Sequence, residues 1–314
     1  MIQDIFPLQL ENQYRSKEPG EGSRLMIFYH NEILVKREGE LDFLPYEALQ
    51  AWCEKYGRSL PKMVYLFSVD ERDYFLTELP EELLPCCTGE GAAASVSAEA
   101  TGSVTTNATG DWKNEWDYEF VRMFAVRSRK PKEQVFAAAT AWHLYVWYRD
   151  NCFCGRCGSR LEHSDKLRML TCPDCDNRVF PKIAPAVIVG VTNGEYILMT
   201  KYANREYKRY ALIAGFTEIG ETAEETVARE VMEEVGLSVK NIRYYKSQPW
   251  GFDSNLLLGY FCELDDPEGL SSIKMDEEEL AEAEWVHYSD VPDDPEGLSL
   301  TREMMTVFKK EFHK

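Results

Sequence analysis

The chain has 314 residues, and 54 acidic against 35 basic side chains give it a formal net charge of −19. At roughly 100–200 residues per domain, this length predicts two or three domains. Apolar residues make up 44% and charged residues 28%, which is ordinary for a globular protein and excludes disorder over the whole chain. The acidity opposes general affinity for nucleic acid and for anionic membranes, because both need clustered Lys and Arg.

The sequence predicts neither a membrane span nor a secretion signal. Its longest nearly apolar stretch, Ile183–Val191, is far below the roughly 20 residues that cross a bilayer. The first residues lack the basic and then apolar pattern of a secretory signal. We therefore expect a soluble, cytoplasmic protein without a membrane partner.

Residues 1–87 are predicted to form a small α+β domain. Strand-like runs lie within 25–35, at Met63–Val69 and from Tyr74, and Tyr46–Tyr56 carries apolar residues at helical spacing.

Two different segments follow this domain. Residues 88–110 contain no aromatic, Lys or Arg side chain, so they cannot bury enough apolar surface to offset the entropy of ordering, and we expect a flexible linker. Residues 111–150 are predicted to connect this linker to the next domain through a strand at Tyr118–Val126 and a helix at Glu133–Asp150.

Residues 151–180 carry two CxxC pairs, Cys154 with Cys157 and Cys172 with Cys175. Two such loops supply four thiolates in a tetrahedron, and four thiolates leave no open position, so the pattern predicts one structural zinc ion in a ribbon. A metal-free loop is the alternative at this site. A zinc ribbon alone would also fit a module that docks nucleic acid or protein.

Residues 181–314 have α/β character. A hairpin is predicted around Asn193-Gly194, further strands at Asn255–Leu264 and Glu284–Tyr288, and a closing helix at Thr301–Phe312.

A carboxylate-rich helix is predicted at Thr222–Val235. Thr222 and Glu225 have capping-box spacing, and Gly236 fits the C-terminal stop. Three glutamates at i, i+3 and i+4 share one face of this helix, where they repel one another unless a cation lies between them: Glu230, Glu233 and Glu234. Mg²⁺ or Mn²⁺ takes such oxygen ligands together with substrate phosphates. The alternative is an exposed acidic helix that binds no metal ion.

The stretch Gly215–Leu237 resembles the Nudix box in every position, with Gly215, Glu221, Arg229, Glu230, Glu233, Glu234 and Gly236 at the motif's spacing. The resemblance implies an α/β/α sandwich with a mixed sheet and metal-dependent hydrolysis of a nucleoside diphosphate linked to another group. It implies that Glu230, Glu233 and Glu234 are catalytic metal-site carboxylates, that the Ala214 carbonyl is a further ligand, and that Glu221 and Arg229 form a structural pair.

A zinc ribbon followed by this box is similar to the NADH pyrophosphatase (NAD diphosphatase) family. Three local stretches carry this resemblance: Phe180–Pro185, Ala214–Phe216 and Ser247–Trp250. It implies substrate contacts at Phe180, Ala214, Phe216, Ser247, Gln248, Trp250 and Phe252, and another metal ligand at Glu279 within a run of three glutamates. The family continues after Trp250 with Pro-Phe-Pro-x-Ser, whereas this chain has Gly251-Phe252-Asp253-Ser254-Asn255.

The resemblance implies hydrolysis of NAD(H) to NMN(H) and AMP, with removal of NAD caps from RNA as an extension, and a homodimer. Two alternatives stay open. One is another Nudix specificity, such as ADP-ribose or dinucleoside polyphosphates, which the altered segment after Trp250 keeps open. The other is a non-enzymatic zinc-ribbon interaction protein with an inactive Nudix domain, which the complete box disfavours. Because of the net charge, we expect NAD(H) to be preferred over a long RNA.

Overall fold

The computed structural model describes residues 1–79, 116–203, 209–265 and 273–312. They form two compact units: the N-terminal unit, Pro7–Val179, and the C-terminal unit, Met1–Phe6 together with Phe180–Lys314. The predicted linker at 88–110 lies outside the described residues. No helix in the described ranges is long and apolar enough to cross a bilayer.

The described part of the N-terminal unit contains three sheets, of which two precede the zinc ribbon. The larger has the strand order β1 (Leu10–Glu11), β6 (Met63–Val69), β7 (Arg72–Thr77), β2 (Arg24–Met26) and β5 (Leu44–Pro45). The smaller has the order β3 (Phe28–Tyr29), β4 (Glu32–Lys36) and β8 (Tyr118–Arg122). The strand-like run within 25–35 is therefore divided, with β2 in the larger sheet and β3 and β4 in the smaller, and His30, with a positive φ of 51°, turns the chain between β3 and β4.

Three helices are found among the described residues of this unit. Helix α1 (Tyr46–Lys55) forms where helical spacing predicts it and buries Leu49, Trp52 and Cys53. The strand predicted to reach Val126 ends earlier, and Met123–Val126 forms the short helix α3. Helix α4 (Lys132–Asp150) buries ten of its residues.

The zinc ribbon belongs to the same unit. Its three short strands are β9 (Glu162–His163), β10 (Leu170–Thr171) and β11 (Arg178–Val179), and both neighbours of β10 are antiparallel to it. Trp147 near the end of α4 packs with Leu161, Leu170 and two cysteines of the ribbon, so the helix and the ribbon share a small core.

The C-terminal unit is built on one mixed sheet. Its strand order is β15 (Val239–Trp250), β16 (Asn255–Leu264), β12 (Ala184–Asn193), β13 (Tyr196–Tyr202) and β17 (Leu280–His287), and β14 (Ile213–Phe216) pairs with β12. Strands β12 and β16 are parallel and the other pairs are antiparallel. Two short 3₁₀ turns, Gly251–Asp253 and Tyr288–Asp290, follow β15 and β17.

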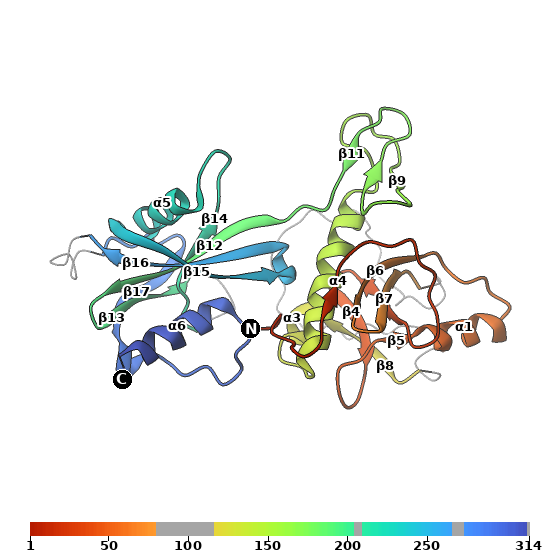
Figure 1. The fold of residues 1–314 in the computed structure, drawn as a ribbon, viewed down its shortest axis with the longest axis horizontal. Coiled ribbons are helices and arrows are strands. Elements are labelled where there is room, and N and C mark those ends of the chain that lie inside the picture. The colour runs from red at the N-terminus through yellow and green to blue at the C-terminus, as the bar shows by residue number, and fades with distance from the viewer. Residues whose placement is uncertain (80–115, 204–208, 266–272, 313–314) are drawn as a thin grey trace, which may run out of the picture. The chain divides into compact units, whose positions relative to one another are not determined.

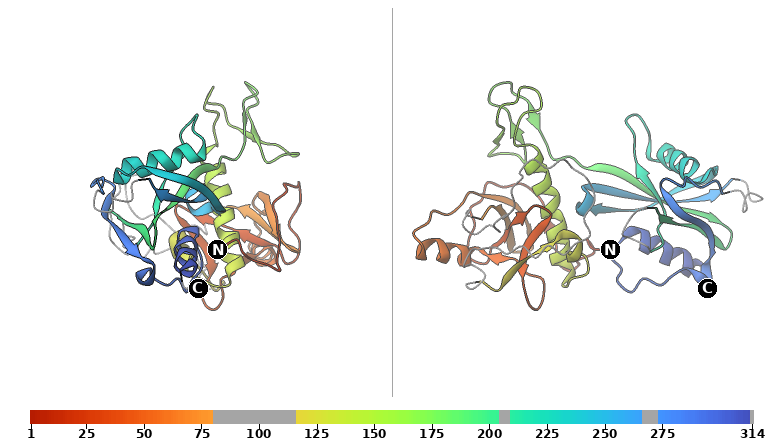
Figure 2. Two further views of the ribbon diagram at one scale, coloured as in Figure 1. Left: turned by 60° about the vertical axis from the view of Figure 1, so that its left-hand side comes forward. Right: turned by 180° about the vertical axis from the view of Figure 1, so that it is seen from behind.

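Two helices cover opposite faces of this sheet (Figure 1), and the reverse view in Figure 2 shows the same layers. Helix α5 (Ala223–Val235) packs its valines on the face that carries Val187 and Val189 of β12. Helix α6 (Leu300–Glu311) packs on the face that carries Ala186 and Ile188. Since side chains alternate along a strand, β12 contributes to both cores, which explains its nearly unbroken apolar sequence. The predicted α+β/α/β fold class is confirmed.

The first six residues differ from expectation. The domain predicted for residues 1–87 includes them, but they belong to the C-terminal unit. Ile2 is fully buried, and its backbone N–H donates to the Leu298 carbonyl at 3.1 Å. Met1 joins the core beneath α6. Burial of these apolar side chains against α6 and its preceding loop explains the placement.

Candidate active site and zinc centre

The four ribbon cysteines come together as the sequence predicts. Their sulfur atoms all lie within 4.8 Å of one another, with Cys154 Sγ 3.7 Å from Cys175 Sγ and Cys157 Sγ 3.4 Å from Cys172 Sγ. A tetrahedral ion with Zn–S bonds of about 2.3 Å places its ligands roughly 3.8 Å apart, so the thiols fit zinc.

Hydrogen bonds lower the pKa of two of these thiols, Cys154 and Cys157, and raise that of Cys175. The Arg156 N–H points at Cys154 Sγ from 3.4 Å and, with further donors, lowers the pKa of that thiol to about 6. Each CxxC loop closes on itself, since Gly158 N–H donates to the Cys154 carbonyl and Asp176 N–H to the Cys172 carbonyl. Gly158 and Asp176 both have positive φ, so one turn uses the expected glycine and the other an aspartate, which tolerates this conformation.

Helix α5 carries the carboxylates of the Nudix-like box. Its capping box is complete: Thr222 Oγ1 accepts from Glu225 N–H, and the Glu225 carboxylate accepts from Thr222 N–H at 2.8 Å. Gly236 ends the helix in the left-handed region, with φ 68°. These two caps fix the start and the end of the segment that presents the three glutamates.

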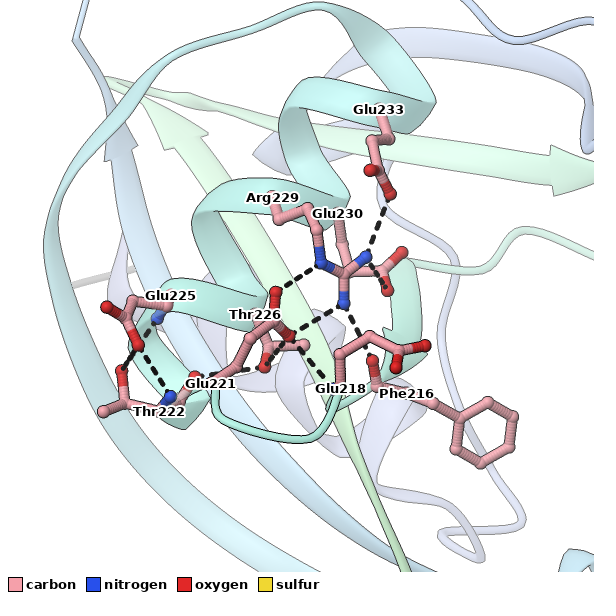
Figure 3. Close-up of polar contacts among 9 residues, drawn as sticks. All are labelled: Phe216, Glu218, Glu221, Thr222, Glu225, Thr226, Arg229, Glu230 and Glu233. Atoms are coloured by element: carbon pink, nitrogen blue, oxygen red, sulfur yellow. Dashed lines mark hydrogen bonds and ion pairs between the residues drawn. The ribbon is translucent and has the colours of Figure 1, made fainter.

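Arg229 connects this helix to the loop before it (Figure 3). Its guanidinium donates to both carboxylate oxygens of Glu221, at 2.6 and 3.0 Å, and to the Phe216 carbonyl at 2.9 Å. It also donates to Glu230 Oε1 at 2.8 Å and to Glu233 Oε2 at 2.9 Å. The guanidinium holds the pKa of Glu221 at about 2, so this pair stays ionised at neutral pH.

Glu230 lies against the backbone of β14. A Cβ added to Gly215 would come within 1.9 Å of the Glu230 carboxyl carbon, so a side chain at this position would fill the space of the carboxylate. Burial raises the pKa of Glu230 although Arg229 opposes the shift, and the charges of Glu233 and Glu279 raise it further. The glutamate of the 277–279 run that acts on Glu230 is therefore Glu279, which supports its place at this site.

The predicted carboxylates offer the oxygen donors that a hard divalent cation prefers, but they do not converge on one point in this structure. Glu230 and Glu234 are buried carboxylates, and Glu234 Oε1 lies 3.4 Å from the Ala214 N–H at β14. Within the described part of the chain, only the four thiols bring three or more ligand atoms within 4.8 Å of one another. Arg229 separates the carboxylates of Glu230 and Glu233 by binding both, and it supplies the positive charge that a cation would otherwise provide.

Sheet register places two predicted stacking residues on one face. Residues directly opposite in neighbouring strands share a face. Trp250 is opposite Asn255, which is opposite Ala184. Phe216 is opposite Ala186, two residues further along β12. The two aromatic side chains thus rise from the same face, three strands apart, or about 14 Å at the usual spacing. Between them on this face, the one that α6 covers, lie Ala184, Asn255 and Leu257.

Neither Ser247 nor Gln248 presents an exposed side chain on this face, although the family signature implies substrate contacts for both. Gln248 shares the face of Trp250 but is fully buried, and Ser247 is opposite Leu258, which packs in the core on the α5 side. Gln248 Nε2 donates to Gln3 Oε1 and to the Leu298 carbonyl, both at 3.0 Å, and Gln248 Oε1 accepts from Leu300 N–H at 2.7 Å. Both amide donors of Gln248 are thus used inside the protein.

The altered segment after Trp250 forms its own contacts. Trp250 Nε1 donates to Asp253 Oδ2 at 2.9 Å, and the Trp250 and Phe252 rings lie 5.1 Å apart. Asp253 thereby stands beside the indole where the family has proline. Phe180, the remaining predicted contact, is exposed at the first position of the long C-terminal segment.

Asn255 was not among the predicted site residues. Its side chain is 9% exposed, and its Oδ1 has no hydrogen-bond partner in the described residues. A buried carbonyl oxygen without a donor is costly, and this one lies opposite Trp250. The sequence signal was its position five residues after Trp250, which a tight hairpin brings opposite the indole.

A separate cavity of about 1040 Å³ lies in the N-terminal unit, lined by Tyr14, Lys62, Tyr145, Tyr148, His163 and others. None of the predicted site residues lines it. The flat side chains in its wall already contact one another, as Phe28 stacks on Tyr145 and His163 on Tyr148.

Comparison with known proteins matches both parts of the site. The family described as NUDIX domain matches residues 182–306, and the NADH pyrophosphatase zinc ribbon domain matches 149–180. The relative named NAD-capped RNA hydrolase NudC from Photorhabdus laumondii is 33% identical over 204 residues, covering 62% of this chain and 77% of that protein. The protein of the same name from Pectobacterium carotovorum is 33% identical over 234 residues, or 72% and 86% of the two chains.

The protein of that name from Salmonella paratyphi C is 42% identical over 149 residues, which are 48% of this chain and 56% of that one. For this relative the chain spans little more than half of its length. The predicted family is confirmed by the two domain matches and by the relatives that the chain covers over more than two thirds of their length. The chain belongs to the Nudix hydrolases with an NADH pyrophosphatase zinc ribbon.

Proposed function

We propose that this protein hydrolyses the pyrophosphate bond of NAD(H) to NMN(H) and AMP, with divalent metal ions, and that it also removes NAD caps from RNA. The observation that carries the proposal is the end of β14, where the exposed ring of Phe216 follows Gly215, against which the Glu230 carboxylate of α5 lies. A dinucleotide has a flat ring at each end and a pyrophosphate between them. Relatives that carry the name NAD-capped RNA hydrolase support the same substrate class.

Hydrolysis of a pyrophosphate depends on positioning and charge neutralisation more than on covalent chemistry. Mg²⁺ or Mn²⁺ held by Glu230, Glu233, Glu234 and Glu279, with the Ala214 carbonyl, would polarise the phosphate and lower the pKa of the attacking water. Arg229 holds α5 and the loop before it together through its hydrogen bonds to Glu221 and to the Phe216 carbonyl.

Recognition of the rings follows from the aromatic pair and its polar neighbour. The exposed Phe216 offers a stacking surface, and Trp250 with Phe252 offers a second one. The Oδ1 of Asn255 would accept a hydrogen bond from a substrate amide or hydroxyl, which removes the cost of its burial. Ser247 and Gln248 are assigned to the support of this surface rather than to substrate contact.

A substrate panel tests the proposal. Purified protein is incubated with NADH, NAD, ADP-ribose and a dinucleoside polyphosphate in Mg²⁺ or Mn²⁺, and the products are identified by mass. NMN(H) together with AMP as the main products supports the proposal. A clear preference for ADP-ribose would instead favour the alternative specificity, for which the carboxylate of Asp253 beside Trp250 is the structural argument. No turnover of any compound would favour the interaction protein.

Preference between the small dinucleotide and capped RNA is tested by competition at physiological salt. We expect higher kcat/KM for NADH, because a net charge of −19 opposes a long polyanion. One basic residue near the Nudix loop, Lys201, is already paired with Glu282. Higher kcat/KM for the RNA would show that local contacts outweigh the global charge.

Two further expectations remain proposals. A homodimer is implied by the family resemblance alone, and light scattering of the purified protein measures it directly. A cytoplasmic location is likewise expected, and fractionation of cells that express the protein tests it.

A further inference from the structure

The segment Ile2–Gln3 lies against the end of β15, far from it in sequence. Gln3 Nε2 donates to the Ser247 carbonyl at 3.4 Å, and Gln3 Oε1 accepts from Gln248 Nε2 at 3.0 Å. Ile2 N–H donates to the Leu298 carbonyl, which also accepts from Gln248. Gln248 thus binds residues from both ends of the unit, Gln3 and Leu298.

Strand β15 needs such support on this side. It is the last strand of its sheet, so β16 holds one edge and leaves the carbonyls of the other edge without a strand partner. Pro249 has no N–H, so it adds no donor on this free edge just before Trp250. Beyond Trp250 the chain turns through Gly251–Asp253 and reverses at Ser254, whose φ is 59°. The position of the indole therefore depends on how firmly residues 247–249 are held.

The contacts of Gln248 transmit this support. Its side chain is fully buried, and its oxygen accepts from Leu300 N–H, one of the helix-start donors of α6 that the helix itself leaves unpaired. Lys246 and Tyr245, just before it, both donate to Glu303 of the same helix, at 3.0 and 2.9 Å. The free edge of β15 is thus tied to α6 directly and to the N-terminal segment through Gln3.

We propose that Gln3 is a positioning residue for the substrate surface: through Gln248 and the Ser247 carbonyl, the N-terminal segment holds Trp250 in the orientation that binds a flat ring. This inference rests on the proposed function for its choice of substrate. Gln3 itself contacts no substrate. Replacing Gln3 should make residues 248–254 less ordered and thereby weaken the binding of substrate.

The test replaces Gln3 by methionine, which keeps the volume of the side chain and removes its donor and acceptor. Gln3→Met should raise KM for NADH roughly five- to tenfold with little change in kcat, as expected for the loss of one or two partly buried hydrogen bonds. Gln9→Met is the matched control, because Gln9 is exposed and its side chain has no hydrogen bond within the described parts of the chain. It should leave KM unchanged.

A double-mutant cycle with Trp250→Ala distinguishes positioning from a general loss of stability. If Gln3 acts through the indole, Gln3→Met has little further effect on KM once Trp250 is removed. Effects on KM that multiply independently, or an unchanged KM in Gln3→Met, would overturn the inference.

Amide hydrogen exchange provides a readout that needs no activity. Exchange at residues 248–254 should become faster in Gln3→Met than in the parent and in Gln9→Met, while exchange in α5 stays the same. Unchanged exchange in that segment contradicts the inference even if the substrate differs from NAD(H). If exchange accelerates but the parent hydrolyses no substrate, the proposed function fails and the positioning contact stands.

Discussion

The close approach of Glu230 to β14 makes Gly215→Ala an informative substitution. The new Cβ would lie 1.9 Å from the carboxyl carbon and 2.0 and 2.2 Å from its two oxygens. Carbon contacts are comfortable from about 3.5 Å, so the carboxylate has to move by roughly 1.5 Å. Because the carboxylate is the end of a flexible side chain, the fold should lose only about 1 kcal/mol of stability.

Activity should respond far more strongly than stability. A misplacement of about 1 Å at a catalytic group can cost on the order of 100-fold in rate, and we expect kcat of Gly215→Ala to fall by about that factor. The melting temperature should fall by less than about 5 °C. Steady-state kinetics with the best substrate of the panel and thermal unfolding measure the two effects.

Gly20→Ala is the control, because an added Cβ at Gly20 meets nothing within 4 Å and the residue does not have positive φ. It should leave kcat and the melting temperature unchanged. Parental kcat in Gly215→Ala would refute the reasoning, since it would mean that the position of the Glu230 carboxylate does not matter to the reaction. Low kcat with an unfolded protein would refute the expectation that the side chain yields before the fold does.

Three other predictions concern the zinc site, Glu234 and Glu221. Metal analysis of protein purified without added zinc should find one zinc ion per chain, and a zinc-to-chain ratio near zero in folded, active protein would contradict this. Because the four-thiolate site is closed, Cys172→Ser should lower the melting temperature while kcat stays similar. Glu234→Gln should remove most hydrolysis and leave the far-ultraviolet circular dichroism unchanged, and turnover at the parental rate would exclude Glu234 from the metal site. Glu221→Gln should lower the melting temperature at pH 7. Since the Glu221 pKa is depressed to about 2, its stabilising contribution is complete above the unfolded value of about 4.5 and is lost as the pH falls toward 2, so the two melting temperatures should converge over that range; a constant difference would argue against the Arg229 pair as its cause.

Features with a local cause were predictable from the sequence. The capping box of α5, the stop at Gly236 and the two CxxC loops each depend on residues within a few positions of one another. Strand β16 forms over Asn255–Leu264 as expected, because a tight turn and an apolar run define it. Helix α5 begins one residue after the predicted start, since Thr222 serves as the cap itself.

Features that depend on long-range packing were not predictable. The burial of Ile2 depends on a contact with Leu298, and no pattern near Ile2 indicates it. The signature around Gln248 gave the residue types but not the face, because only the register of β15 against β16 and the contact with Leu300 show that the carboxamide turns inward. Arg229 was expected to pair with Glu221, but its additional bonds to Glu230 and Glu233 required the helix in three dimensions.

The split C-terminal unit has a consequence for biosynthesis. Gln3 emerges from the ribosome early, yet its partner Gln248 follows 245 residues later. The N-terminal unit, 7–179, can complete its fold within that interval, because domains generally fold as units in the order of synthesis. Met1–Phe6 cannot form their contacts with Gln248, Leu298 and α6 until these residues have left the ribosomal exit tunnel. The contact that supports Trp250 is therefore among the last to form, and premature termination before α6 would yield a finished zinc ribbon beside a Nudix sheet without its N-terminal support.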